Sequence, residues 1–145
     1  MLKIILTFLL IINLSFSAIA EGFDDSLDKI RVEINRDNLN EALKELGKIK
    51  IASEDQQEKI NLLFGDIYLK INKPEKAITF YEKAFFTSDT NIESLSELGL
   101  SEAYLRQGKL SEAIKHAKRS LEIDKDRVRS KIVLAIALTR NGDKD

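Results

Sequence analysis

Cysteine and tryptophan do not occur in this sequence of 145 residues, and proline occurs only once. The lack of cysteine suits an oxidising compartment, where unpaired thiols are a liability, although many cytosolic proteins also lack it. Six glycines and one proline are too few for a low-complexity or disordered chain. Neither sign of charge is in large excess, since 23 basic and 24 acidic side chains leave a net charge of -1. This balance argues against nucleic acid as a partner, and the length suits one domain.

The first twenty residues follow the pattern of a secretory signal peptide. Lys3 supplies a positive charge, residues 4–14 are apolar apart from Thr7 and Asn13, and Ala18 and Ala20 frame a peptidase site. We therefore expect residues 1–20 to be removed and the mature chain to begin at Glu21. The alternative is an uncleaved anchor in the inner membrane, although the apolar stretch is short for a bilayer, which needs about 20 residues.

A repeat of about 35 residues organises the rest of the sequence. Residues 73–78 (KPEKAI) and 109–114 (KLSEAI) are alike at an offset of 36, and Tyr68 and Tyr104 precede them at the same offset. Arg106 to Gly108 correspond to residues 140–142 at an offset of 34. Self-similarity at this period is typical of proteins built from stacked helical units.

Each repeat unit is predicted to form two helices. Apolar residues recur every three or four positions, and no window shows the alternation of a strand. Ser53 with Gln56, and Thr90 with Glu93, have the spacing of N-terminal caps, while Gly108 and Gly142 are placed to end helices. The expected helices are residues 24–35, 38–50, 53–71, 74–87, 91–107, 110–123 and 126–140.

At these positions the sequence resembles the tetratricopeptide repeat (TPR) family. The resemblance implies an all-α fold, a short right-handed α-solenoid of about three and a half helix pairs. The expected domain is residues 21–145, divided into a degenerate repeat at 21–50, repeats at 53–88 and 91–124, and a half repeat at 126–141. The residues that carry the resemblance and are expected to pack the repeats are Phe64, Gly65, Tyr68, Ala77, Tyr81, Ala84, Leu100, Tyr104, Gly108 and Ala113. The third unit departs from the pattern, with Ser101 for the usual glycine and Ala117 for the usual aromatic residue.

The resemblance also implies a groove that binds proteins or peptides, lined by the first helix of each pair. The groove positions are Lys59, Leu62, Asp66, Leu69, Leu95, Leu98, Glu102, Leu105, Arg129, Ile132, Ile136 and Thr139, with Lys70, Arg106 and Arg140 at the rim. An apolar floor with mixed charges suits an amphipathic helix or an apolar peptide. The alternative is that the leucines only pack against neighbouring first helices. Because Leu62 and Asp66 replace the lysine and asparagine of chaperone-tail-binding relatives, binding of a C-terminal carboxylate is not expected.

Catalytic and metal-binding patterns are not found in the sequence. His116 is the only histidine, and with no cysteine it has too few companions for a metal site, so a solvated or half-buried histidine is expected. The basic residues around it alternate with acids, as on a salt-bridged helical surface. No phosphate loop, dinucleotide fingerprint or nucleophile elbow occurs. We expect no enzyme, no cofactor and no bound metal.

The function that these patterns favour is that of an exported TPR adaptor in a bacterial periplasm that helps to assemble an envelope or secretion complex. A structural module that associates with itself, and a truncated TPR protein, are the alternatives. The final helix is apolar over a wide arc that includes Val128, Ile132, Val133, Ile136 and Ala137. Exposed apolar surface at the end of such a stack tends to find a partner, so we expect an interface there, with a second copy or with the target.

Overall fold

The computed structural model describes residues 22–85 and 87–142, and all regular structure in these ranges is helical. The prediction of an all-α chain is therefore confirmed over the described residues. The chain divides into two compact units at Ile49 and Lys50. The predicted signal peptide and mature N-terminus lie outside the described residues.

The first unit contains a helix of residues 22–35 and α2, Leu39–Leu46. The earlier helix buries Phe23, Leu27, Ile30 and Ile34, which follow the helical period. Helix α2 buries Ala42 and Leu46. The predicted second helix, residues 38–50, is thus shorter than expected. Gly47 lies directly after α2, and the backbone then turns.

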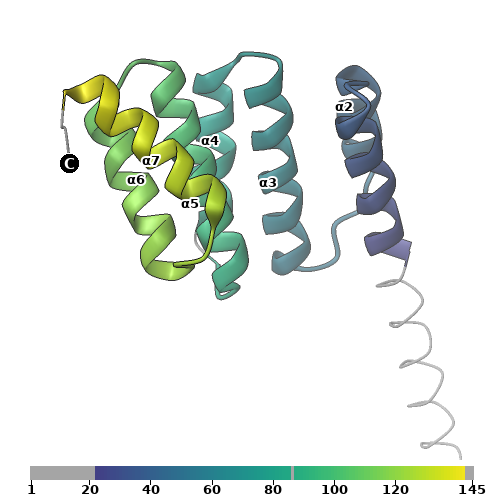
Figure 1. Cartoon of the computed structure of the whole chain (residues 1–145). Helices are drawn as coiled ribbons and strands as arrows, with labels where there is room; N and C mark the ends of the chain where they lie inside the picture. The colour runs from purple at the N-terminus through teal and green to yellow at the C-terminus, as the bar shows by residue number, and fades with distance from the viewer. Residues whose placement is uncertain (1–21, 86, 143–145) are drawn as a thin grey trace, which may run out of the picture. The chain divides into compact units, whose positions relative to one another are not determined.

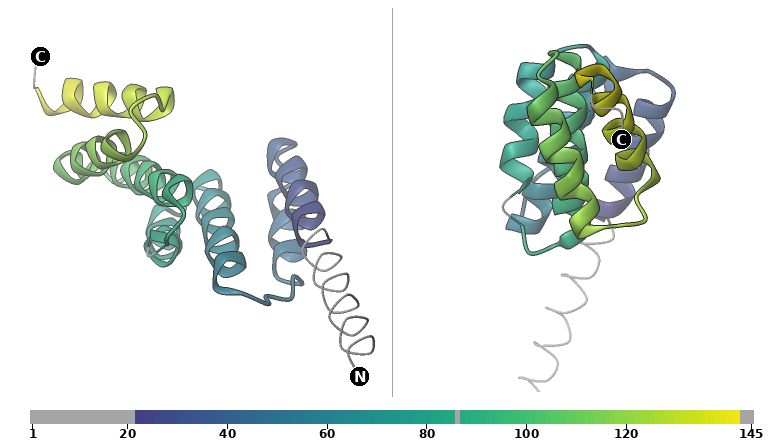
Figure 2. Two further views of the ribbon diagram at one scale, coloured as in Figure 1. Left: turned by 90° about the horizontal axis from the view of Figure 1, so that it is seen from below. Right: turned by 60° about the vertical axis from the view of Figure 1, so that its left-hand side comes forward.

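The second unit contains five helices (Figure 1). They are α3 (Glu54–Lys70), α4 (Pro74–Phe85), α5 (Thr90–Arg106), α6 (Leu110–Ile123) and α7 (Val128–Asn141). Each helix packs against the next one along the chain, and the first helices of successive pairs also touch, α3 against α5 and α5 against α7. The helices thus form stacked pairs, in agreement with the predicted all-α solenoid, and two further views show the order from α3 to α7 (Figure 2).

Left-handed residues end the first helix of every pair. Asp37, Asn72, Gly108 and Gly142 all have positive φ, at intervals of 35, 36 and 34 residues. After the first three, the next amide donates to a carbonyl five residues earlier, as Lys73 N does to the Tyr68 oxygen at 2.8 Å. This bond satisfies a carbonyl that the helix leaves unpaired. The repeat period is therefore visible in the backbone, including the pair whose sequence is degenerate.

Of the two N-terminal caps predicted from the sequence, one is confirmed and one is wrong. The Ser53 side chain accepts a bond from the Gln56 amide, so the predicted cap of α3 is confirmed. The predicted cap of α5 at Thr90 is wrong, because Asp89 caps this helix and accepts from the amides of Asn91 and Ile92. A carboxylate is the stronger acceptor at a helix N-terminus. Asp89 is also held by its own amide, which donates to the hydroxyl of Thr87.

The core of the second unit is built on one tyrosine between α4 and α5. Tyr81 is 1% exposed and packs in a cluster with Leu69, Ala77, Leu100 and Ala103. A Cβ added at Gly65 would lie 2.5 Å from its ring, and one added at Gly99 would lie 2.4 Å from it. Only glycine fits at either distance. Two glycines on two helices therefore make the space that one ring fills.

Candidate protein-binding face

The positions predicted to line a groove lie on α3, α5 and α7, and we call them the first-helix face. Their exposure differs from helix to helix. Leu69 and Leu98 are buried, whereas Arg129, Ile132, Ile136 and Thr139 are exposed. The remaining positions are half-buried, and they are Lys59, Leu62, Asp66, Leu95, Glu102 and Leu105. The face is thus closed by its own leucines at α3 and α5 and open at α7.

The leucines of α3 and α5 take part in packing within the unit. Leu69 belongs to the cluster around Tyr81, and Leu62 packs against the same cluster. Leu98 is 6% exposed. Substitution of these leucines would therefore disturb the fold as well as any partner, and they are poor probes of binding.

The apolar surface that remains free lies on α7. Val128 is 65% exposed, Ile132 54% and Ile136 39%, and these three are spaced by four residues. Residues at that spacing lie on one side of a helix. The opposite side of α7 is buried through Ser130, Val133 and Ala137. The wide apolar arc expected from the sequence thus separates into a packed side and an exposed stripe, and we call the latter the α7 stripe.

Polar groups lie beside these apolar positions. The Tyr81 hydroxyl donates to Asp66 Oδ1 at 2.8 Å. Burial raises the pKa of Tyr81 well above its usual range, and the charge of Asp66 raises it further. The tyrosine is therefore a fixed neutral donor that holds the Asp66 carboxylate in place.

Glu102 and Arg129 form a bidentate pair between α5 and α7. Arg129 Nη2 donates to Glu102 Oε2 at 2.9 Å, and Nε donates to the other oxygen. The hydrogen bond to Glu102 raises the pKa of Arg129, and the charge of Asp66 adds to this effect. The Arg129 side chain is nevertheless 71% exposed, whereas that of Glu102 is 14% exposed. The carboxylate is thus fixed in the face, and the guanidinium covers it from the solvent side.

Two of the other basic groups at this face have partners within the chain. Lys59 Nζ lies 2.8 Å from Asp55 Oδ2 on α3. Arg106 Nη1 donates to the carbonyl oxygen of Leu69. This bond joins the C-terminal ends of α3 and α5, where a cation is favoured. Lys70 and Arg140 are exposed.

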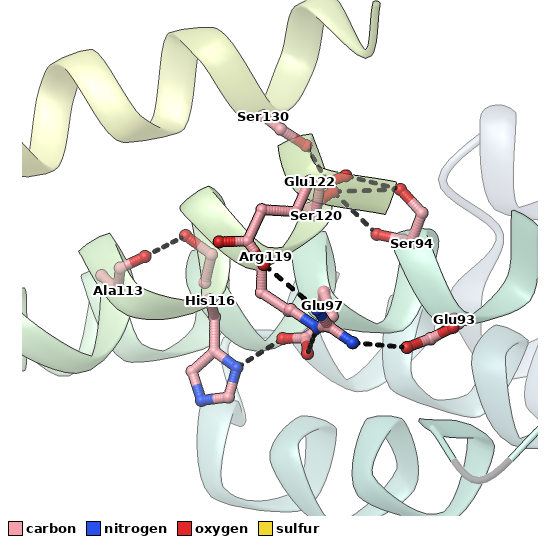
Figure 3. Close-up of polar contacts among 10 residues, drawn as sticks. Glu93, Ser94, Glu97, Ala113, His116, Arg119, Ser120, Glu122 and Ser130 are labelled. Atoms are coloured by element: carbon pink, nitrogen blue, oxygen red, sulfur yellow. Dashed lines mark hydrogen bonds and ion pairs between the residues drawn. The ribbon is translucent and has the colours of Figure 1, made fainter. Parts of the chain in front are cut away.

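His116 lies in an ion-pair cluster between α5 and α6 (Figure 3). Its Nδ1 is 2.6 Å from Glu97 Oε2, and its ring stacks on Tyr104 at a centroid distance of 5.3 Å. Arg119 continues the cluster, with Nη2 3.5 Å from Glu93 and Nη1 3.1 Å from Glu122.

His116 is therefore the half-buried residue that the sequence predicts, but its partner Glu97, which is 5% exposed, was not foreseen. In the sequence, Glu97 lies close to Ser94, Ser96 and Ser101 on a largely buried helix. This group of polar residues is the signal from which a buried polar contact could have been predicted.

Serine hydroxyls join α5, α6 and α7 in the same region (Figure 3). Ser120 Oγ donates to the Ser94 carbonyl at 2.9 Å and lies 2.8 Å from Ser130 Oγ. Arg127 Nε donates to Ser94 Oγ at 2.8 Å. All three serines are fully buried, so each needs these partners. This network fixes the start of α7 and hence the position of the α7 stripe.

Over residues 22–85 and 87–142, no group of three or more histidine, cysteine or acidic side chains is placed to hold a metal ion. In the same ranges, none of the helices combines the length and apolar character needed to cross a bilayer.

Comparison with known proteins supports the repeat assignment. Residues 58–85 and 98–127 match the family model described as tetratricopeptide repeat. The chain is also similar to the tetratricopeptide repeat protein 21 homologs of Caenorhabditis elegans, at 32% identity, and Caenorhabditis briggsae, at 31% identity, over 83 residues. The aligned segment is 57% of this chain and 6% of each relative. Two segments of the second unit are therefore similar to tetratricopeptide repeats, and such repeats imply a protein-interaction module.

Proposed function

We propose that this protein is an exported adaptor that binds another protein through its first-helix face. The observation that carries the proposal is the α7 stripe, where Val128, Ile132 and Ile136 are exposed on a helix whose other side is packed. Apolar side chains gathered on an exposed face mark interaction sites. The polar groups of Asp66, Glu102 and Arg129 beside the stripe suit a partner segment with apolar and charged sides.

The proposed location is the bacterial periplasm, and the proposed process is assembly of an envelope or secretion complex. The support is the pattern of residues 1–20, with a positive start, an apolar middle and an Ala18–x–Ala20 end. Sequencing the N-terminus of protein from its native host tests this. A start at Glu21 is expected, and an intact Met1 in the membrane fraction would instead mean an anchored protein.

Binding through the stripe can be tested by substitution. Ile132→Gln with Ile136→Gln should remove the partner that crosslinks to the wild-type protein in its host, because the apolar side chains are lost. Val32→Gln with Ile51→Gln is the matched control, since these two are also exposed apolar residues, at 44% and 45%. Both variants should keep the wild-type circular-dichroism spectrum. If both variants crosslink the partner in equal amounts, the proposal that this face binds the partner is refuted.

Self-association is the second candidate, and the same stripe favours it. Native mass spectrometry of the purified protein distinguishes the two. A dimer that dissociates on substitution of Ile132 and Ile136 would support self-association, whereas a monomer that still crosslinks a different protein supports the adaptor.

A further inference from the structure

We infer that the α7 stripe docks an amphipathic segment whose apolar side is bordered by aspartate or glutamate. This inference rests on the proposed function, since it states which partner the same helix selects. Three features support it, namely the charge on α7, the pairing of the carboxylates on the first-helix face, and the repulsion that a second copy would meet.

Helix α7 is basic and contains no acidic side chain. Its charged residues are Arg129, Lys131 and Arg140. The other helices of the described residues each contain at least one aspartate or glutamate. The next most basic of them, α6, has three lysines and arginines against two glutamates. The helix that exposes the apolar stripe is thus also the helix with the largest excess of positive charge.

The cations of α7 lie along both edges of the stripe. With about 3.6 residues per turn, Arg129 and Arg140 fall on one side of Ile132, and Lys131 falls on the other. Lys131 and Arg140 are exposed, and within residues 22–85 and 87–142 neither forms an ion pair. A segment that covers the stripe would place its own edge residues next to these two cations. Carboxylates at those edges would be attracted, and further cations would be repelled.

The two carboxylates of the first-helix face are bonded within the chain. Asp66 accepts from the Tyr81 hydroxyl at 2.8 Å, and Glu102 accepts from Arg129 Nη2 at 2.9 Å. Glu102 thus compensates one cation of α7 and leaves the other two. The turn before α7, residues 124–127, has two acids and two bases and adds no net charge. The acids that would balance the remaining two cations of α7 can therefore come from a partner.

A second copy of this chain is a poor occupant of the stripe. Two α7 helices in contact would bring the three basic side chains of each copy together, with no acid on either helix. Like charges that face each other across an interface suppress association. An acidic segment is attracted by the same side chains, so charge favours a different chain over self-association.

Selection from a phage library of random 12-residue peptides against the full chain tests the inference. We expect enrichment of sequences that combine aspartate or glutamate with apolar residues. Lys131→Gln with Arg140→Gln should weaken binding of a selected peptide by about fivefold, because two exposed ion pairs are lost. This difference from the wild-type protein should disappear at about 1 M salt, where exposed charges are screened. The matched control, Lys115→Gln with Lys118→Gln, removes two exposed cations from α6 and should leave the affinity unchanged.

The outcomes separate this inference from the proposed function. Enrichment of basic or uncharged peptides whose binding depends on Ile132 and Ile136 would overturn the acidic partner and leave the binding face standing. Equal losses of affinity for the two double variants would do the same, since the cations beside the stripe would then have no particular role. Failure to enrich any peptide above an uncoated control would overturn both.

Two other occupants of the stripe are distinguished by separate measurements. Cosedimentation with vesicles of phosphatidylcholine and phosphatidylglycerol tests a lipid surface, which basic amphipathic helices can bind. We expect no binding to the vesicles. Binding that is lost with Ile132→Gln and Ile136→Gln would mean that α7 recognises lipid and would overturn the inference. A dimer in native mass spectrometry that the same two substitutions dissociate would overturn it in favour of a second copy.

Discussion

The two layers of repeats in the second unit solve one packing problem in different ways. Between α4 and α5, the large ring of Tyr81 fills the space, with glycines at 65 and 99 on either side. Counted from the left-handed residue after each first helix, the equivalent positions in the next layer are Ser101, Ala117 and Val133. One layer concentrates its volume in a single side chain, and the other distributes it over three. A buried aromatic ring is thus one of two ways in which this chain fills a layer.

The hydrogen bonds made by the equivalent side chains also differ between the two layers. The Tyr81 hydroxyl reaches Asp66 on the first-helix face. In the next layer, Ser101 Oγ donates to the Ala113 carbonyl at 2.7 Å, which stays inside the helix pair. The tyrosine layer therefore connects the core with the proposed binding face, whereas the serine layer fixes only the helices.

The largest expected effect comes from removing the ring. Tyr81→Ala should lower the free energy of unfolding by about 3 to 5 kcal/mol, because it leaves a cavity with two glycines on its walls. Urea denaturation followed by circular dichroism measures the change. A loss below about 1 kcal/mol would mean that α4 and α5 close the gap, and that the two layers are less different than the structure indicates.

Gly99→Val is expected to have the next largest effect. It introduces the side chain that the other layer has at Val133, and its Cβ alone would lie 2.4 Å from the Tyr81 ring. We expect a loss of about 2 to 3 kcal/mol from overpacking. In the double variant with Tyr81→Ala, the total loss should be smaller than the sum by about 1 to 3 kcal/mol. If the losses of the two single variants simply add, Gly99 and Tyr81 do not compete for one space, and the comparison between the layers is contradicted.

Ala77→Leu tests a feature that both layers share. Ala77 and Ala113 are fully buried at equivalent positions. A leucine at either one should cost about 1 to 3 kcal/mol, because the helices approach closely there. The thermal midpoints of the two variants should fall by similar amounts. An unchanged midpoint for either one would argue against the repeat alignment.

The smallest expected effect concerns the ends of the first helices. Asn72 has positive φ where Gly108 stands in the next repeat. Asn72→Gly should stabilise the protein by less than about 1 kcal/mol, because asparagine already tolerates the left-handed region. Gly108→Ala should destabilise it. Denaturation midpoints that move in the same direction for both variants would contradict the equivalence of these turns.

Much of the fold could be read from the sequence because its signals are local. The start of α4 at Pro74, the cap at Ser53 and the stop at Gly108 all depend on residues within one turn. The cap at Asp89 was missed because Thr90 and Glu93 match a common pattern one residue later. Local patterns do not show which of two neighbouring acceptors the backbone will use.

Contacts between helices could not be read in the same way. Gly99 was not recognised as the second neighbour of Tyr81, because the two are 18 residues apart and only packing brings them together. The pairing of Glu97 with His116 and of Glu102 with Arg129 has the same cause. The predicted face could be assigned from the repeat period, but exposure along it depends on how the helices pack. The free stripe at α7 could not be separated from the buried leucines of α3 and α5.

The most direct test of the account is photo-crosslinking in the native host, with a photoreactive amino acid placed at position 132. We expect an adduct between this protein and a different protein at position 132, and none at position 118, an exposed residue on α6. An adduct from position 118 and none from position 132 would contradict it.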